Sequence, residues 1–124
     1  MDFDSLAARL HNGISEQKSF FESFAIRLEQ LLPGIVTVTH KKKLFSKTNE
    51  IESLRASVEP FVYSLTLSSQ GIVAQKSKVV RNITLKTDKI DFKTWLEDFV
   101  EAMSKATEND KDTRDALDDF LFYL

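Results

Sequence analysis

The 124-residue chain contains no cysteine, so a disulfide framework, a thiolate nucleophile and a cysteine-ligated zinc site are all excluded. It has only two histidines, His11 and His40, and they lie in separate segments that we do not expect to meet. Three glycines leave little for a phosphate-cradling loop, and no HExxH, GxSxG, Walker or GxGxxG pattern occurs. We therefore expect no enzyme, no cofactor and no metal site.

Membrane and secretion signals are also missing from the sequence. No apolar run approaches the length of a membrane-spanning helix, and the N-terminal residues include Asp2 and Asp4 where a signal peptide needs a basic region. The composition is 42% hydrophobic and 29% charged, which suits a globular domain with a core and a charged surface. We expect a single domain, residues 1–124, in a soluble, cytoplasmic protein.

The net charge of −2 hides a strong asymmetry along the chain. Residues 1–34 carry a charge of −2, residues 35–90 carry +6, and residues 91–124 carry −6. The middle segment holds ten basic and four acidic side chains, and the last segment holds four basic and ten acidic ones. A basic middle and an acidic end favour complementary docking, either with a partner protein or between copies of this chain.

Apolar residues in the first third recur at three- and four-residue steps, as on one face of a helix. Pro33 and Gly34 predict the end of that helix, because neither residue continues a helix well. The pair Asn12–Gly13 leaves two alternatives, one helix broken near Gly13 or two helices that abut there. The apolar positions are Phe3, Leu6, Leu10, Ile14, Phe21, Phe24, Leu28 and Leu31.

From Ile35 the period changes to two, which indicates strands with one buried and one polar side. Short connections between the segments predict an antiparallel meander of four or five strands. The strand segments are 35–40, 51–58, 61–67, 72–75 and 79–87. The expected buried side includes Phe61, Tyr63, Leu65, Leu67, Ile83 and Leu85. The expected polar side includes Thr37, Thr39, Arg55, Ser57, Ser64, Thr66, Thr84 and Lys86.

Helical spacing returns after Asp91, which we expect to cap a helix that ends near residue 106. Ile90 before the cap and Trp95 after it fit a hydrophobic staple. A last short helix follows and carries Leu117 and Phe120 on its apolar face. The predicted fold is therefore α+β, in the order α-β(4–5)-α-α, with the helices packed on one face of the sheet.

The acidic stretch from residue 108 to residue 119 does not fit a calcium-binding loop. Its two best alignments place Arg114 where an oxygen ligand is required, or Thr113 where the sharp turn needs glycine. Pairs spaced i, i+4 on a helix surface explain the charges better. Asp110 with Arg114, and Glu101 with Lys105, have this spacing.

The segment 40–47, HKKKLFSK, predicts first a hairpin tip and second a docking device for an acidic partner. Further cations are expected on the polar sheet face and at a turn near residues 76–81. This face lacks the outward aromatic residues on which single-strand nucleic-acid readers stack bases. The candidate partner-binding residues are Lys41, Lys42, Lys43, Lys47, Arg55, Lys76, Lys78, Arg81 and Lys86.

Two functions fit these observations. The first is a non-catalytic protein–protein interaction module, such as a small adaptor, chaperone-like or regulatory domain, with a basic sheet face and an acidic C-terminal region. The alternative is an anion binder that takes nucleic acid or acidic lipid headgroups through the clusters at 41–43 and 76–81. The apolar C-terminus, Phe122, Tyr123 and Leu124, either docks on the protein's own core or forms a self-complementary dimer contact.

Overall fold

The computed structural model describes residues 14–43 and 46–122, with the backbone alone for residues 14–16, 42–43 and 46–49. The described chain begins with helix α2 (Ile14–Leu31). Five strands follow, β1 (Val36–Lys43), β2 (Ser46–Val58), β3 (Phe61–Ser68), β4 (Gly71–Val80) and β5 (Ile83–Ile90). Helices α3 (Phe92–Ala106) and α4 (Lys111–Phe122) complete it. The predicted α+β class is confirmed, and Gly13, the predicted break point, lies outside the described residues.

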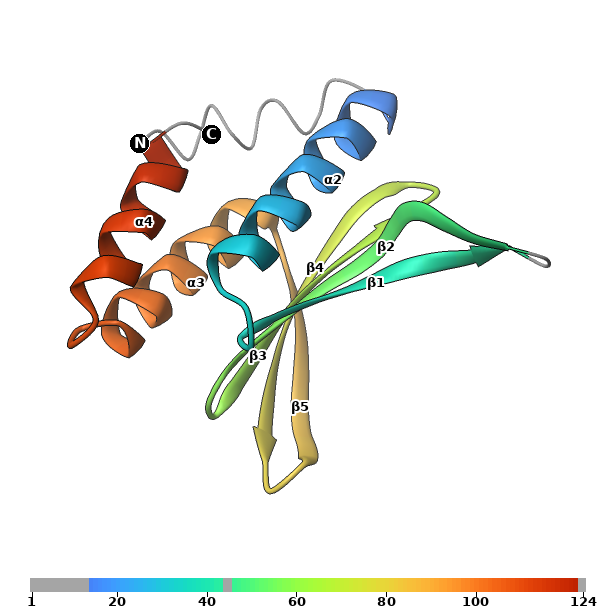
Figure 1. Cartoon of the computed structure of the whole chain (residues 1–124). Helices are drawn as coiled ribbons and strands as arrows, with labels where there is room; N and C mark the ends of the chain where they lie inside the picture. Colours follow the sequence, from blue (N-terminus) through green and yellow to red (C-terminus); the bar gives the residue numbers. More distant parts are fainter. Residues whose placement is uncertain (1–13, 44–45, 123–124) are drawn as a thin grey trace.

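The strands form one sheet in the order β1-β2-β3-β4-β5, and every neighbouring pair is antiparallel. Short connections make this order the natural one, because a strand that reverses through a tight turn pairs with the strand before it. Helices α2 and α3 lie against one face of the sheet and α4 packs against α2, while the β4–β5 hairpin extends beyond them (Figure 1). No helix in the described part of the chain is long and apolar enough to cross a membrane.

Trp95 lies at the centre of the core, between the sheet and the helices. Its ring stacks on Phe99 with centroids 5.2 Å apart, and it meets Tyr63 of β3 edge-on at 6.0 Å. It also contacts Phe24 of α2 at 6.4 Å. The indole Nε1–H donates a hydrogen bond to the backbone oxygen of Gln75 in β4, 3.2 Å away. One side chain therefore joins α2, α3 and two strands, and its polar atom is satisfied by the sheet.

The helix ends follow local sequence signals. Helix α2 ends at Leu31, two residues before Pro33, and Gly34 adopts a φ of 89° that a residue without Cβ tolerates best. Asp91 caps α3 as predicted, because its Oδ1 accepts a hydrogen bond from the backbone N–H of Thr94 at 2.8 Å. This hydrogen bond is the main reason that the pKa of Asp91 lies below its usual value.

The predicted ion pair between Asp110 and Arg114 is wrong, because Asp110 caps α4 instead. Its Oδ1 accepts a hydrogen bond from the backbone N–H of Thr113 at 3.2 Å, and its Oδ2 accepts one from the Thr113 hydroxyl at 2.7 Å. These bonds hold the pKa of Asp110 below its usual value. The predicted pair between Glu101 and Lys105 is confirmed, with Nζ and Oε1 3.5 Å apart.

The prediction of one strand over residues 79–87 is wrong. Strand β4 continues to Val80, a two-residue turn follows, and β5 begins at Ile83. Both turn residues have positive φ, 52° for Arg81 and 67° for Asn82, which is the backbone of the tightest hairpin turns. Arginine is an unusual residue for this conformation, so the turn carried only a weak signal in the sequence.

Candidate functional site

The predicted basic residues do not share one face of the sheet. Arg55 is exposed on the uncovered face, opposite Ser64 in the ladder. Lys76 lies opposite Tyr63, whose ring is in the core, so Lys76 is on the side covered by helices. Lys78 and Lys86 lie opposite each other on that same side, beyond the helices. The expectation that Lys86 shares a face with Arg55 is therefore wrong.

A β-bulge explains the error. The β4–β5 pairing shifts its register between Lys78 and Val79, so the alternation of β5 does not continue that of the ideal ladder. A shift of one residue moves side chains to the opposite face. Lys76 and Lys78 also lie inside β4 rather than at a turn, because the hairpin turn comes at Arg81.

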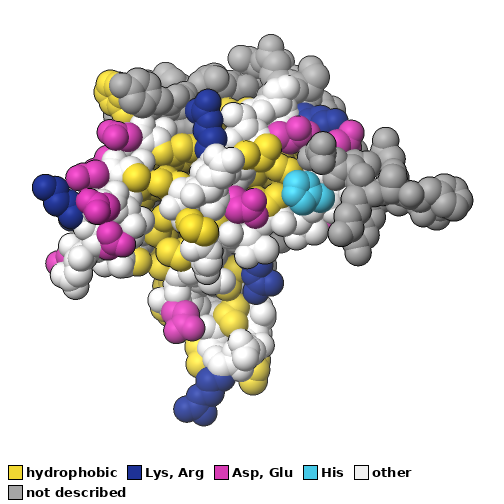
Figure 2. All heavy atoms as spheres, in the orientation of Figure 1, with side chains coloured by type: hydrophobic (Ala, Val, Ile, Leu, Met, Phe, Trp, Pro, Cys, Tyr) yellow, Lys and Arg dark blue, Asp and Glu magenta, His cyan; other side chains and the backbone are white. Residues whose placement is uncertain are grey.

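The β4–β5 arm, which we define as residues 78–86, carries three of the five exposed large apolar side chains among the described residues. Ile83 is 63% exposed, Leu85 59% and Val80 40%, although the sequence predicted Ile83 and Leu85 to be buried. Lys78, Lys86 and Arg81 border these side chains. Figure 2 shows hydrophobic and basic side chains together on this projecting hairpin. The helices do not reach this far along the sheet, so neither side of the arm is covered (Figure 1).

A groove with a volume of about 490 Å³ lies between α3 and the β2–β3 turn. Lys76 crosses it, with Nζ 3.3 Å from Oδ2 of Asp98 and 4.3 Å from the centroid of the Phe61 ring. Tyr63 lines the same groove, and burial raises the pKa of its hydroxyl. Lys76 is therefore held by a carboxylate and an aromatic ring, which makes it part of the fold more than a free cation.

A second groove, of about 700 Å³, lies at the base of the arm and brings Arg55 and Arg81 together. Val79, Val80 and Phe61 supply its apolar lining. It adjoins the same β2–β3 turn as the first groove, since Glu59 and Pro60 line both. Of the predicted cations, only these two arginines share this groove, and the exposed part of the arm continues from it.

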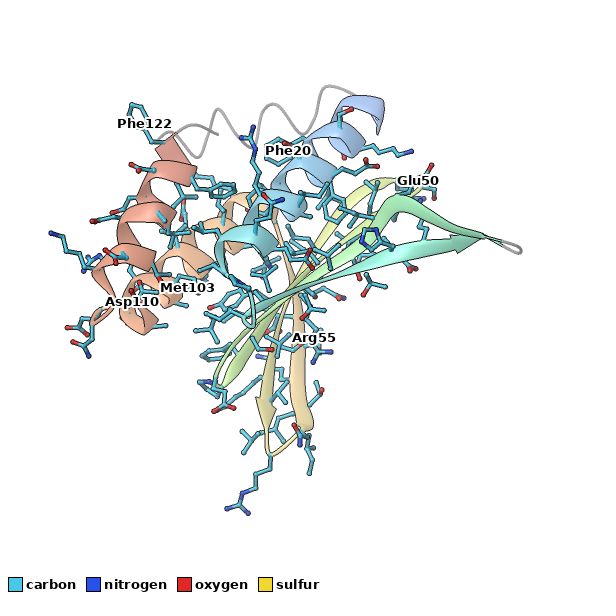
Figure 3. The ribbon with its side chains drawn as sticks, in the orientation of Figure 1. Phe20, Glu50, Arg55, Met103, Asp110 and Phe122 are labelled. Carbon is cyan, nitrogen blue, oxygen red and sulfur yellow. The ribbon has the colours of Figure 1, made fainter. Side chains whose placement is uncertain are left out.

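Those of the other candidate residues that the structure describes lie away from the arm. Lys41 is half-buried in β1. The side chains of Lys42, Lys43 and Lys47 fall outside the described residues. The backbone of Lys42 pairs with that of Lys47 across the β1–β2 hairpin, as predicted for a hairpin tip. Phe122 is 74% exposed at the end of α4, at the opposite end of that helix from Asp110 (Figure 3). Tyr123 and Leu124 lie outside the described residues.

Comparison with protein-family models, with curated proteins and with solved structures finds no match for this chain. The geometry must therefore carry the functional argument. Within residues 14–43 and 46–122, no three His, Asp or Glu side chains are grouped as a metal site requires. The arm instead offers apolar side chains with cations around them, an arrangement that can bind a protein surface.

Proposed function

We propose that this protein is a non-catalytic protein-interaction module that binds its partner through the β4–β5 arm. The observation that supports this most is the exposure of Ile83, Leu85 and Val80 on a projecting hairpin. A two-stranded hairpin with neither of its faces packed against another element is only marginally stable in water. Exposed apolar patches with a polar border are typical of surfaces that another protein covers.

The size of the effect follows from the exposed area. Burial of apolar surface contributes about 25 cal/mol per Å², so covering the exposed parts of Ile83 and Leu85 contributes about 1–2 kcal/mol each. The border of Lys78, Arg81 and Lys86 favours a partner with carboxylates around its own apolar surface. These charges raise the rate of encounter and make it dependent on salt.

A protein partner fits the arrangement better than an anionic polymer or membrane. Two of the candidate cations already have carboxylate partners, Lys76 with Asp98 at 3.3 Å and Lys86 with Asp88 at 3.5 Å. A phosphate binder gains most of its affinity when its lysines and arginines neutralise phosphates and the counterions condensed on the phosphates are released. Cations that are already paired with carboxylates contribute less to this. Steep salt-dependent retention of the purified protein on DNA, RNA or anionic vesicles would favour the anion binder instead.

The test compares an arm variant with a matched control. Ile83→Ser with Leu85→Ser removes the apolar side chains of the arm, and Ile26→Ser removes one from α2, where Ile26 is 43% exposed. Proteins captured from native lysate by the wild type and by Ile26→Ser should be lost with the arm variant, while circular dichroism stays the same for all three. Equal capture by all three proteins, together with self-association of the arm variant as strong as that of the wild type, refutes the proposed function.

A further inference from the structure

We propose that β5 pairs antiparallel with β5 of a second copy, in a register centred on Thr87, so that one sheet runs through both molecules. This inference rests on the proposed function, because it identifies the second copy as the partner of the arm. Three features of β5 support it, namely its free edge, the order of its charges and its pairing with Lys78.

The free edge of β5 is open along its length. Residues 83–89 are all exposed, and within the described residues their backbone pairs only with β4. The opposite edge of the sheet is partly occupied, because Pro33 bridges to Val36 of β1 and Oε2 of Glu29 accepts a hydrogen bond from Val38 N at 3.2 Å. An unprotected edge strand is a template for another strand. The sheet therefore has one edge ready to pair.

The charges of β5 select a register for self-pairing. When two copies pair antiparallel about Thr87, Lys86 of each lies opposite Asp88 of the other, and opposite charges at such positions attract. Centring the pair on Lys86 or on Asp88 sets like charges directly opposite. A register centred between Thr87 and Asp88 sets Lys86 opposite Lys89, which are like charges. A register centred between Lys86 and Thr87 places no charged residue of β5 opposite a residue of opposite charge.

The neighbouring strand adds to this preference. Lys86 lies directly opposite Lys78 within one copy, and like charges at such a position destabilise a sheet. Within one copy, Asp88 partly offsets the repulsion between Lys86 and Lys78, because its Oδ2 lies 3.5 Å from the Lys86 Nζ. A second carboxylate, from Asp88 of the other copy, would flank Lys86 on the open side.

In this register Ile83 of one copy falls opposite Asp91, the N-cap of α3 in the other copy, where the strand ends. The pairing therefore covers the open backbone edge of β5 up to that point in both copies.

The first experiment separates pairing between copies from the ion pair within one copy. Asp88→Lys makes both positions basic and Lys86→Glu makes both acidic, so each variant alone should self-associate at least tenfold more weakly than the wild type in analytical ultracentrifugation. An equimolar mixture should form a heterodimer, because both cross-strand contacts are then attractive. If the two variants stay monomeric in the mixture, or the purified wild type is monomeric at millimolar concentration, the inference is wrong.

The second experiment reads the register directly, using the absence of cysteine from the chain. Residues directly opposite in an antiparallel pair have Cα atoms about 4.5–5.5 Å apart, which is within reach of a disulfide. Thr87→Cys should therefore give a covalent dimer on mild oxidation, whereas Lys89→Cys, which would face Leu85, should not. Equal or faster cross-linking of Lys89→Cys overturns the register.

The outcomes of these experiments and of the capture experiment are independent. If no dimer forms but the arm variant still loses captured proteins, only the self-pairing is refuted and a different partner binds the arm. If the arm variant captures the same proteins as the wild type and the dimer does form, the arm serves assembly alone.

Discussion

Replacing Trp95 is the sharpest test of how the core is held together. Trp95→Phe keeps an aromatic ring against Phe99 but removes the indole N–H that bonds to the backbone oxygen of Gln75 at 3.2 Å. The lost hydrogen bond costs about 1 kcal/mol, and the smaller ring leaves a cavity that costs about 1 kcal/mol more. We expect the free energy of unfolding to fall by about 2 kcal/mol.

Trp95→Ala should cost more, about 3–5 kcal/mol, because it also removes the contacts with Tyr63 and Phe24. Urea unfolding followed by far-UV circular dichroism is the suitable assay, since the substitution removes the only tryptophan fluorophore. Glu97→Ala, at an exposed position of the same helix, is the control and should change stability by less than about 0.5 kcal/mol. A cost for Trp95→Phe as small as that of the control would refute the central role of the indole.

Three further predictions concern the helix cap, the groove and a turn. Asp91→Ala should lower stability by about 1 kcal/mol at neutral pH, and Asp91→Asn should lower it less, because asparagine also caps helices. Lys76→Ala and Asp98→Ala, in a double-mutant cycle, should show a coupling of about 0.5–1 kcal/mol that weakens in high salt, because the pair is partly exposed. Gly71→Ala should cost more than about 1 kcal/mol, because Gly71 has a φ of 117°, which a residue with a Cβ adopts only under strain.

The sign of the pH dependence follows from the direction of the Asp91 pKa shift. Its pKa is lower in the folded state, so its contribution is fully present above its unfolded pKa and is lost as the pH falls through the folded value. Stability measured from pH 6 down to pH 2 should therefore fall less steeply for Asp91→Asn than for the wild type. Parallel pH curves would contradict the cap, salt-independent coupling would contradict the Lys76–Asp98 prediction, and a wild-type melting temperature for Gly71→Ala would contradict the turn prediction.

Much of the architecture could be predicted because the spacing of apolar residues along the chain differs between helices and strands. The steps of three and four through Phe21, Phe24 and Leu28 and the alternation from Phe61 to Leu67 match the helix and strand that contain them. Pro33 and Asp91 mark boundaries by simple chemistry, one ending a helix and the other capping one. Local signals of this kind act over a few residues, so a single sequence is enough to read them.

The arm could not be predicted in the same way. Its turn at Arg81–Asn82 lacks glycine, and its bulge near Lys78 changes which side chains share a face. An alternating strand such as the one containing Ile83 indicates a buried side, but only the reach of the helices decides whether that side is covered. The asparagine between two β-branched runs was the one available signal, because asparagine tolerates positive φ.

The order of the sheet has a consequence for synthesis on the ribosome. Each strand finds its partner in the segment just made, so successive hairpins can form while translation continues. Closure of the hydrophobic interior waits for α4, whose Leu117 and Leu121 are buried and whose Phe120 ring lies 5.8 Å from that of Phe24. A nascent chain stalled before Lys111 would therefore hold a paired sheet while the aromatic side chains that α4 covers, such as Phe24, are still exposed to water. In this state the chain most needs a chaperone.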